Sequence, residues 1–125
     1  MIVAGFGFRT SASAASLLDA FEQAAGATAP THLSAPGDKI DAPCLRDAAA
    51  SLCLPVVAVE DFAQVETVTQ SAKILAERGV GSVAEAVALV AAGEGARLLA
   101  PRTISADRLA TCAVAIAAGN RGDAS

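Results

Sequence analysis

Along the chain, continuous apolar runs typical of buried strands alternate with segments whose apolar residues recur at helical spacing. Residues 2–4 form a continuous apolar run, which extends to residue 8 if the intervening glycines are included, and this run predicts a buried strand. From residue 11 to residue 25 the apolar positions recur at helical spacing, which predicts a helix that ends at Gly26. The remaining elements predicted in this way are a weak strand at residues 31–34, a loop at 35–39, a helix from 43 to about 52, strands at 54–59, 97–100 and 110–117, a helix at 82–92 and a charged turn at 102–108.

Polar residues at the first two helix starts support these assignments. Thr10, Ser11 and Ser13 are each suited to cap the helix that follows them, because a side-chain oxygen can accept from a free N–H of the first turn. Asp41 stands just before Pro43, and proline is favoured in the first turn of a helix. We therefore expect Asp41 to cap the second helix.

Strands alternate with helices, which predicts an α/β fold: a three-layer α/β/α sandwich around a mostly parallel or mixed sheet. The last two strands are separated by a short connection and predict a hairpin, which would make the sheet mixed. The length of 125 residues and the hydrophobic fraction of 54% suit a single domain, which we place at residues 1–119, before a polar tail at 120–125. Residues 60–63 predict a short turn or helix, and residues 65–78 mix extended and helical preferences.

The composition excludes several classes of function. The formal net charge is -4 and only 3% of the residues are aromatic, so neither a basic patch nor rings for base stacking point to nucleic acid. The apolar runs are too short for a transmembrane helix, and the N-terminus lacks the pattern of a signal peptide. We expect a cytoplasmic protein that does not bind membranes.

The cysteines do not form a metal-binding pattern. Cys44, Cys53 and Cys112 are odd in number and show no C-x-x-C spacing, and His32 is the only histidine. We therefore expect no metal and no cofactor, and interpret the cysteines as small buried thiols. His32 falls on or near a strand, where a structural role is expected rather than catalysis.

The residues after the first strand have a pattern suited to binding anions. Gly5 and Gly7 would let the backbone turn, Arg9 supplies a guanidinium group, and the hydroxyls of Thr10 and Ser11 precede the helix. A helix start carries free N–H groups and a partial positive charge, which favour a carboxylate or phosphate. The alternative is a tight strand-to-helix connection without a ligand. The dinucleotide fingerprint is excluded, because it requires glycine where Thr10 stands.

Two further segments, residues 39–43 and 82–86, also lie where a loop meets a helix start. Because helix starts gather at one edge of a parallel sheet, we expect Arg9, Lys39, Asp41 and Glu85 to converge there. The alternatives are that Lys39 is a solvated loop residue and that Glu85 only completes a capping box. The predicted ligand-binding residues are Gly5, Gly7, Arg9, Thr10, Ser11, Lys39, Ser82 and Glu85, and the candidate catalytic residues are Lys39, Asp41 and Glu85.

In order and spacing, these segments resemble the cobalamin-biosynthesis family that comprises CobE and the C-terminal domain of CbiG. The family's G-x-G-x-R turn corresponds to residues 5–9, and its K-x-D-E-P-like segment to residues 39–43. Its V-x-E-x-A-A-L-like segment corresponds to residues 83–89, and a late T-x-A-x-A strand to residues 111–117. The chain departs from the family at Ala42, where an acidic residue is common, so position 42 supplies no carboxylate for a mechanism that needs one.

The resemblance implies a role in building the corrin ring of vitamin B12, at the ring-contraction stage. It implies that the chain binds a precorrin or related tetrapyrrole, whose acetate and propionate groups suit Arg9 and Lys39. It allows two alternatives: a cobalt-precorrin 5A hydrolase-like enzyme that opens a precorrin lactone with Glu85 or Asp41 as acid–base, or a module that docks on another pathway enzyme. The rings of Phe6 and Phe8 would pack on the ligand or in the core.

Overall fold

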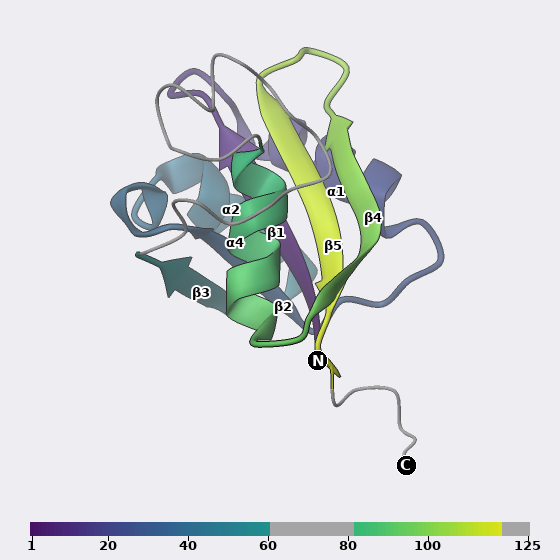
Figure 1. Cartoon of the computed structure of the whole chain (residues 1–125). Coiled ribbons are helices and arrows are strands. Elements are labelled where there is room, and N and C mark those ends of the chain that lie inside the picture. Colours follow the sequence, from purple (N-terminus) through teal and green to yellow (C-terminus); the bar gives the residue numbers. More distant parts are fainter. Residues whose placement is uncertain (61–81, 119–125) are drawn as a thin grey trace.

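A mixed five-stranded sheet with the strand order β3-β2-β1-β5-β4 forms the centre of the molecule (Figure 1). The computed structural model describes residues 1–60 and 82–118. The elements are β1 (Ile2–Phe8), α1 (Ala14–Ala25), β2 (His32–Pro36), a 3₁₀ turn (Gly37–Lys39), α2 (Pro43–Leu52), β3 (Val56–Val59), α4 (Val83–Ala92), β4 (Arg97–Ile104) and β5 (Ala110–Ile116).

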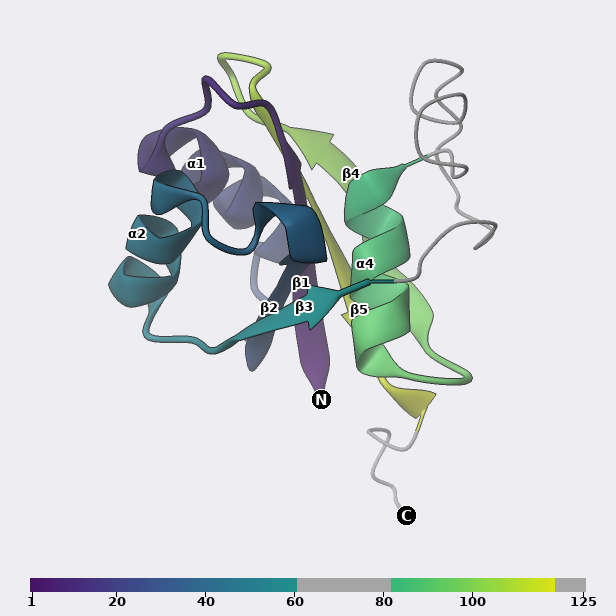
Figure 2. The same cartoon turned by 90° about the vertical axis from the view of Figure 1, so that its left-hand side faces the viewer.

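The strand directions confirm the predicted mixed sheet. β1 pairs in parallel with β2, and β2 pairs in parallel with β3. β5 runs antiparallel to both β1 and β4, so β4 and β5 form the expected hairpin and β4 points the same way as β1. Helices α1 and α2 cover one face of the sheet and α4 covers the other, which gives the predicted α/β/α layers (Figure 2).

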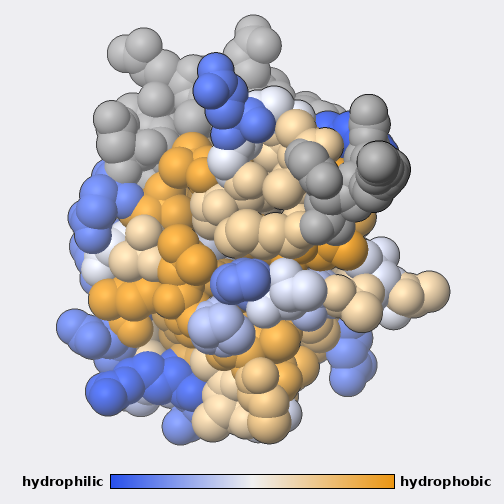
Figure 3. All heavy atoms as spheres, turned by 90° about the horizontal axis from the view of Figure 1, so that it is seen from below, coloured by the Kyte–Doolittle hydropathy of each residue, from blue (hydrophilic) through white to orange (hydrophobic). Residues whose placement is uncertain are grey.

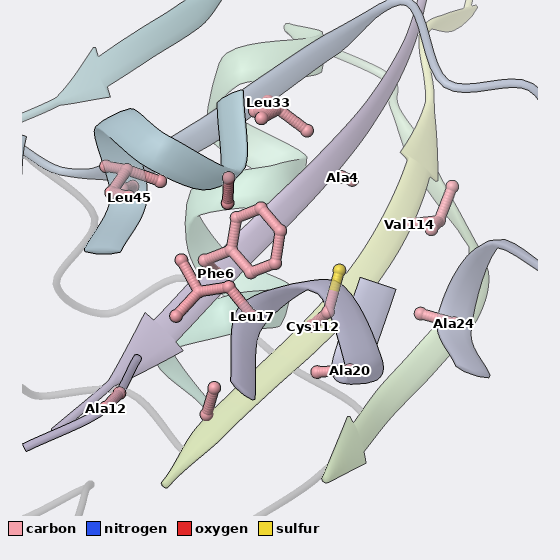
Figure 4. Close-up of a cluster of buried hydrophobic side chains, with 13 residues drawn as sticks. Ala4, Phe6, Ala12, Leu17, Ala20, Ala24, Leu33, Leu45, Cys112 and Val114 are labelled. Atoms are coloured by element: carbon pink, nitrogen blue, oxygen red, sulfur yellow. The ribbon is translucent and has the colours of Figure 1, made fainter. Parts of the chain in front are cut away.

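Alternate residues of β1 build two cores, one on each face of the sheet. Phe6 is completely buried towards α1 and α2, where it packs among Leu17, Cys112 and other apolar side chains (Figure 4). Its ring also stacks on Phe21, with 6.5 Å between the ring centroids. On the other face Val3 packs with small residues of α4 and β5. Phe6 is therefore a core residue and does not face a ligand.

The ends of α1 and α2 follow local rules only in part. Ser13 caps α1, because its Oγ accepts from the Ser16 N–H, and Gly26 ends the helix with a positive φ of 52°. Pro43 opens α2 as expected, but the N-cap is Ala42 and no side chain caps the helix. The prediction that Asp41 is the cap was therefore wrong. Cys53 ends α2 in the left-handed conformation, with φ at 57°.

β4 is longer than predicted, because the expected turn at residues 102–108 is strand as far as Ile104. A register shift between Ala100 and Thr103 accommodates Pro101, which lacks an N–H and is tolerated in an edge strand. The loop expected at residues 35–39 was also partly wrong, because β2 continues to Pro36.

Some expectations lie outside the described residues, among them the segment 65–78, most of 60–63 and the tail at 120–125. Within the described ranges, no helix is both long enough and apolar enough to cross a membrane. All three cysteines are free, and the prediction of buried thiols holds for Cys112 but is wrong for Cys53, which is exposed.

Candidate functional site

The carboxyl ends of β1, β2 and β3 lie at one edge of the sheet, where α1 and α4 begin. α4 starts over the end of β1, since a Cβ on Gly7 would lie 3.4 Å from the Val83 Cβ. This edge is the region in which the sequence predicted a site, and we call it the loop edge. The opposite edge, seen from below, presents a largely apolar surface with scattered polar side chains (Figure 3).

Lys39 is bound to the end of β1. Its Nζ donates a hydrogen bond to the Phe8 carbonyl oxygen at 3.2 Å and lies 5.2 Å from the centroid of the Phe8 ring. An ammonium group over an aromatic face is held by the ring quadrupole as well as by the hydrogen bond. Lys39 is therefore not a freely solvated loop residue, and its charge is placed beside Arg9.

Arg9 is exposed, and its backbone holds the loop that follows β1 in place. The Arg9 N–H donates to the Leu109 carbonyl at 2.9 Å, and the Arg9 carbonyl accepts from Ala12 at 3.0 Å. Thr10 and Ser11 are also exposed, and neither caps α1 because Ser13 does. The backbone bonds thus hold this loop at the loop edge, where Arg9, Thr10 and Ser11 are all exposed.

Gly5 and Gly7 do not form a turn, because β1 runs through both of them. A Cβ on Gly5 would lie 2.7 Å from the Ala88 N and 2.8 Å from the Ala88 Cβ, and closer still to the Ala84 carbonyl. A Cβ on Gly7 would lie 3.0 Å from the Thr111 Oγ1. The glycines therefore let α4 approach β1 closely, which places the start of α4 at the loop edge.

Glu85 lies in the first turn of α4 and is completely buried. One half of the predicted capping box is present, since the Ser82 Oγ accepts from the Glu85 N–H at 3.3 Å. The Glu85 Oε2 accepts from the Arg102 N–H at 2.8 Å, in the irregular part of β4. The carboxylate therefore joins α4 to β4, and it is not exposed at the loop edge as Arg9 is.

Acidic residues also lie at this edge, and Asp41 and Glu60 are two of them. Asp41 is exposed two positions after Lys39. Glu60, which directly follows β3, was not predicted as a site residue, and its carboxylate lies against Gly37, where a Cβ would collide with it. An acidic residue immediately after an apolar strand is the sequence signal that could have identified Glu60.

Residues 1–60 and 82–118 contain no group of three or more histidine, cysteine or acidic side chains that could hold a metal ion. Burial raises the pKa of the Cys112 thiol, which disfavours the thiolate. At the loop edge the described side chains offer the cations of Arg9 and Lys39, two exposed hydroxyls and exposed carboxylates.

Comparison with known proteins points to one pathway. Residues 2–115 match the family described as "Cobalamin synthesis G C-terminus". The crystal structure of CobE, described as a protein from the cobalamin (vitamin B12) biosynthetic pathway, is 32% identical with a TM-score of 0.76, and the match covers 92% of this chain and 89% of that one. The cobalamin biosynthesis protein chiG of Agrobacterium tumefaciens is 33% identical with a TM-score of 0.70, over 94% of this chain and 99% of that one.

A putative cobalamin biosynthesis protein G homolog from Sulfolobus solfataricus shares the fold. It is 19% identical with a TM-score of 0.65, and the match covers 91% of this chain but only 36% of that one. No curated protein sequence matches the chain.

Proposed function

The chain belongs to the cobalamin synthesis G C-terminal family, and we propose that it binds a precorrin or related tetrapyrrole intermediate of cobalamin biosynthesis at the ring-contraction stage. The observation that carries this proposal is the placement of Lys39 against the end of β1, beside the exposed Arg9. Tetrapyrroles of this kind carry acetate and propionate groups around a flat apolar ring. Two cations at one edge suit those carboxylates, because hydrogen bonds between charged partners are the strong ones.

The Phe8 side chain also supports this proposal, because it suits the flat apolar ring of the ligand. Its ring is half-buried and lies beneath the Lys39 ammonium. A ligand carboxylate bound by Lys39 would therefore bring the tetrapyrrole close to an aromatic side chain. Phe6 has no part in this contact, because it is completely buried in the core.

The test is a visible-absorbance titration of the purified protein with a panel of precorrins, followed by analysis of the recovered pigment. We expect a spectral shift and recovery of the pigment unchanged. The Arg9→Ala variant should bind about tenfold more weakly, the loss expected for one charge-assisted hydrogen bond. The matched control is Arg97→Ala, which removes an exposed arginine at the start of β4, on the opposite edge of the sheet.

A hydrolase acting on a precorrin lactone is the second candidate function. It is favoured by the exposed carboxylate of Asp41, two residues from Lys39. In that mechanism Asp41 would act as acid–base and Lys39 would stabilise an oxyanion. Glu85 fits this role less well, because its side chain is completely buried and holds the Arg102 N–H.

The same titration separates the candidates. Conversion of the pigment by the protein, lost in Asp41→Asn, would favour the hydrolase over a binding protein. Equal affinities of wild type and Arg9→Ala would contradict the proposed site. No spectral shift with any precorrin would favour the third candidate, a module that docks on another enzyme of the pathway.

A further inference from the structure

A second exposed arginine lies beside Arg9 at the loop edge. The ladder between β1 and β5 pairs Phe8 with Ala110, and the Arg9 N–H then donates to the Leu109 carbonyl at 2.9 Å. The tip of the β4–β5 hairpin therefore lies next to the loop that follows β1. Arg108 is at this tip and is exposed.

The backbone of Arg108 has a conformation that arginine rarely adopts. Its φ is 64°, in the left-handed region, where a side chain other than that of glycine, asparagine or aspartate is disfavoured. The Arg108 N–H donates to the Ser105 carbonyl at 2.8 Å, which closes the turn. Residues held in such conformations are concentrated at functional sites, where the surrounding structure enforces them.

Asp107 fixes this turn on α1. Its Oδ1 accepts from the Ser105 Oγ at 2.6 Å and from the Leu109 N–H at 3.0 Å, and its Oδ2 accepts from the Ser16 Oγ at 2.5 Å. These hydrogen bonds lower the pKa of the Asp107 carboxyl below its ordinary value, so the group is ionised at neutral pH. Both carboxylate oxygens are engaged within the turn and with α1.

Two further hydrogen bonds attach the flanks of the turn to α1. The Ala106 N–H donates to the Asp19 Oδ2 at 2.6 Å, and the Gln23 Nε2 donates to the Ile104 carbonyl at 3.1 Å. The hairpin tip is thus held on a helix at several points. The backbone at Arg108 is therefore already ordered in the free protein. Less conformational entropy is lost when an arginine on such a backbone binds a ligand.

Neither guanidinium group has a partner among the residues that the structure describes. No hydrogen bond or ion pair involves the side chain of Arg9 or of Arg108 in the ranges 1–60 and 82–118. A ligand with carboxylate groups would supply acceptors for both guanidinium groups at once.

We propose that Arg108 is a ligand-binding residue of the loop edge, which holds a carboxylate of the ligand together with Arg9 and is positioned by Asp107. This inference rests on the proposed function and extends the site from the β1–β2 side of the edge to the β4–β5 hairpin. An arginine at this position strains the backbone, because glycine or asparagine would adopt the positive φ more easily.

The test uses uroporphyrin, a stable porphyrin with an acetate and a propionate on each pyrrole ring, whose fluorescence reports binding. Arg108→Gly and Arg108→Asn both remove the charge and suit a positive φ. We expect each variant to bind about tenfold more weakly. We also expect each to keep or raise the melting temperature, because the strain is removed. The salt dependence of binding should be smaller than in wild type, since one charge contact is lost.

The outcome distinguishes this inference from the proposed function. If Arg9→Ala weakens binding and both Arg108 variants bind as wild type does, the inference is wrong and the proposed function stands. If the wild type binds neither uroporphyrin nor any precorrin, both are wrong. A loss of affinity in the Arg108 variants equal to that in Arg97→Ala would show a general charge effect and would also overturn the inference.

Discussion

Replacing Gly5 by alanine should separate α4 from the sheet. Gly5 lies in the middle of β1, directly beneath the second turn of α4. The new Cβ would meet the Ala84 carbonyl and the Ala88 backbone, so the obstacle is main chain, which cannot rotate away as a side chain can. Either the helix or the strand must move.

The size of the effect follows from the distances. The Cβ would lie 2.8 Å from the Ala88 Cβ, whereas two carbon atoms prefer about 3.5–4.0 Å, so α4 would have to shift by about 1 Å. A gap of that size forfeits roughly a quarter to a half of each van der Waals contact along the helix. Overpacking of this kind costs about 1–3 kcal/mol, and we expect about 3 kcal/mol because the clash is with backbone. For a domain of this size that loss lowers the melting temperature by about 10 °C.

Thermal and urea unfolding followed by circular dichroism would measure this loss. The matched control is Gly7→Ala, whose Cβ would lie 3.0 Å from the Thr111 Oγ1, a side-chain atom that can move. We expect that variant to lose less than half as much stability. Two equally stable variants, or a Gly5→Ala protein within 0.5 kcal/mol of wild type, would refute the close approach of α4 to β1.

Two further predictions concern titratable groups. The pKa of Asp107 is lowered from its ordinary value of 3.8. Its carboxylate therefore stabilises the fold above pH 3.8. This stabilisation is lost as the pH falls through the lower pKa of the folded state. Urea unfolding of wild type and Asp107→Asn should therefore differ at pH 6 and converge well below pH 3.8; a constant difference would contradict the assignment. Cys53 is exposed and Cys112 is buried with a raised thiol pKa, so a thiol reagent should label Cys53 in the folded protein and Cys112 only on unfolding. Equal labelling rates in the native state would be inconsistent with this structure.

Local signals predicted the elements whose ends are marked by their own residues. Helix α1 has a serine cap and a glycine stop, and α4 has Ser82 before it and Gly93 after it. In both cases the start and the end depend on hydrogen bonds within a few residues. The carboxyl part of β4 was missed, because Pro101 and the charged residues after it are typical of a turn. Only pairing with β5 makes this segment a strand.

The sequence predicted which edge of the sheet carries Arg9 and Lys39, but not the contacts that these residues make. The order of strands and helices placed Arg9 and Lys39 at the same edge of the sheet, as the topology of parallel strands requires. The contact between Lys39 and Phe8 could not be predicted, because it joins the end of β1 to the 3₁₀ turn that follows β2. The buried position of Glu85 was also unpredicted, since it depends on the irregular register of β4.

By itself the sequence determined the class of fold, the approximate extent of the capped helices and the family to which the chain belongs; α1 begins at Ala14, later than the predicted residue 11. These depend on periodicity, on hydrogen bonds between near neighbours and on the order of short motifs, all of which are present in the linear chain. The tertiary structure alone decided the roles of particular residues. Gly5 proved to be a contact surface for α4 and Arg108 a neighbour of Arg9. Such roles depend on which segments pack together, and packing distances between remote segments are not encoded in any local pattern.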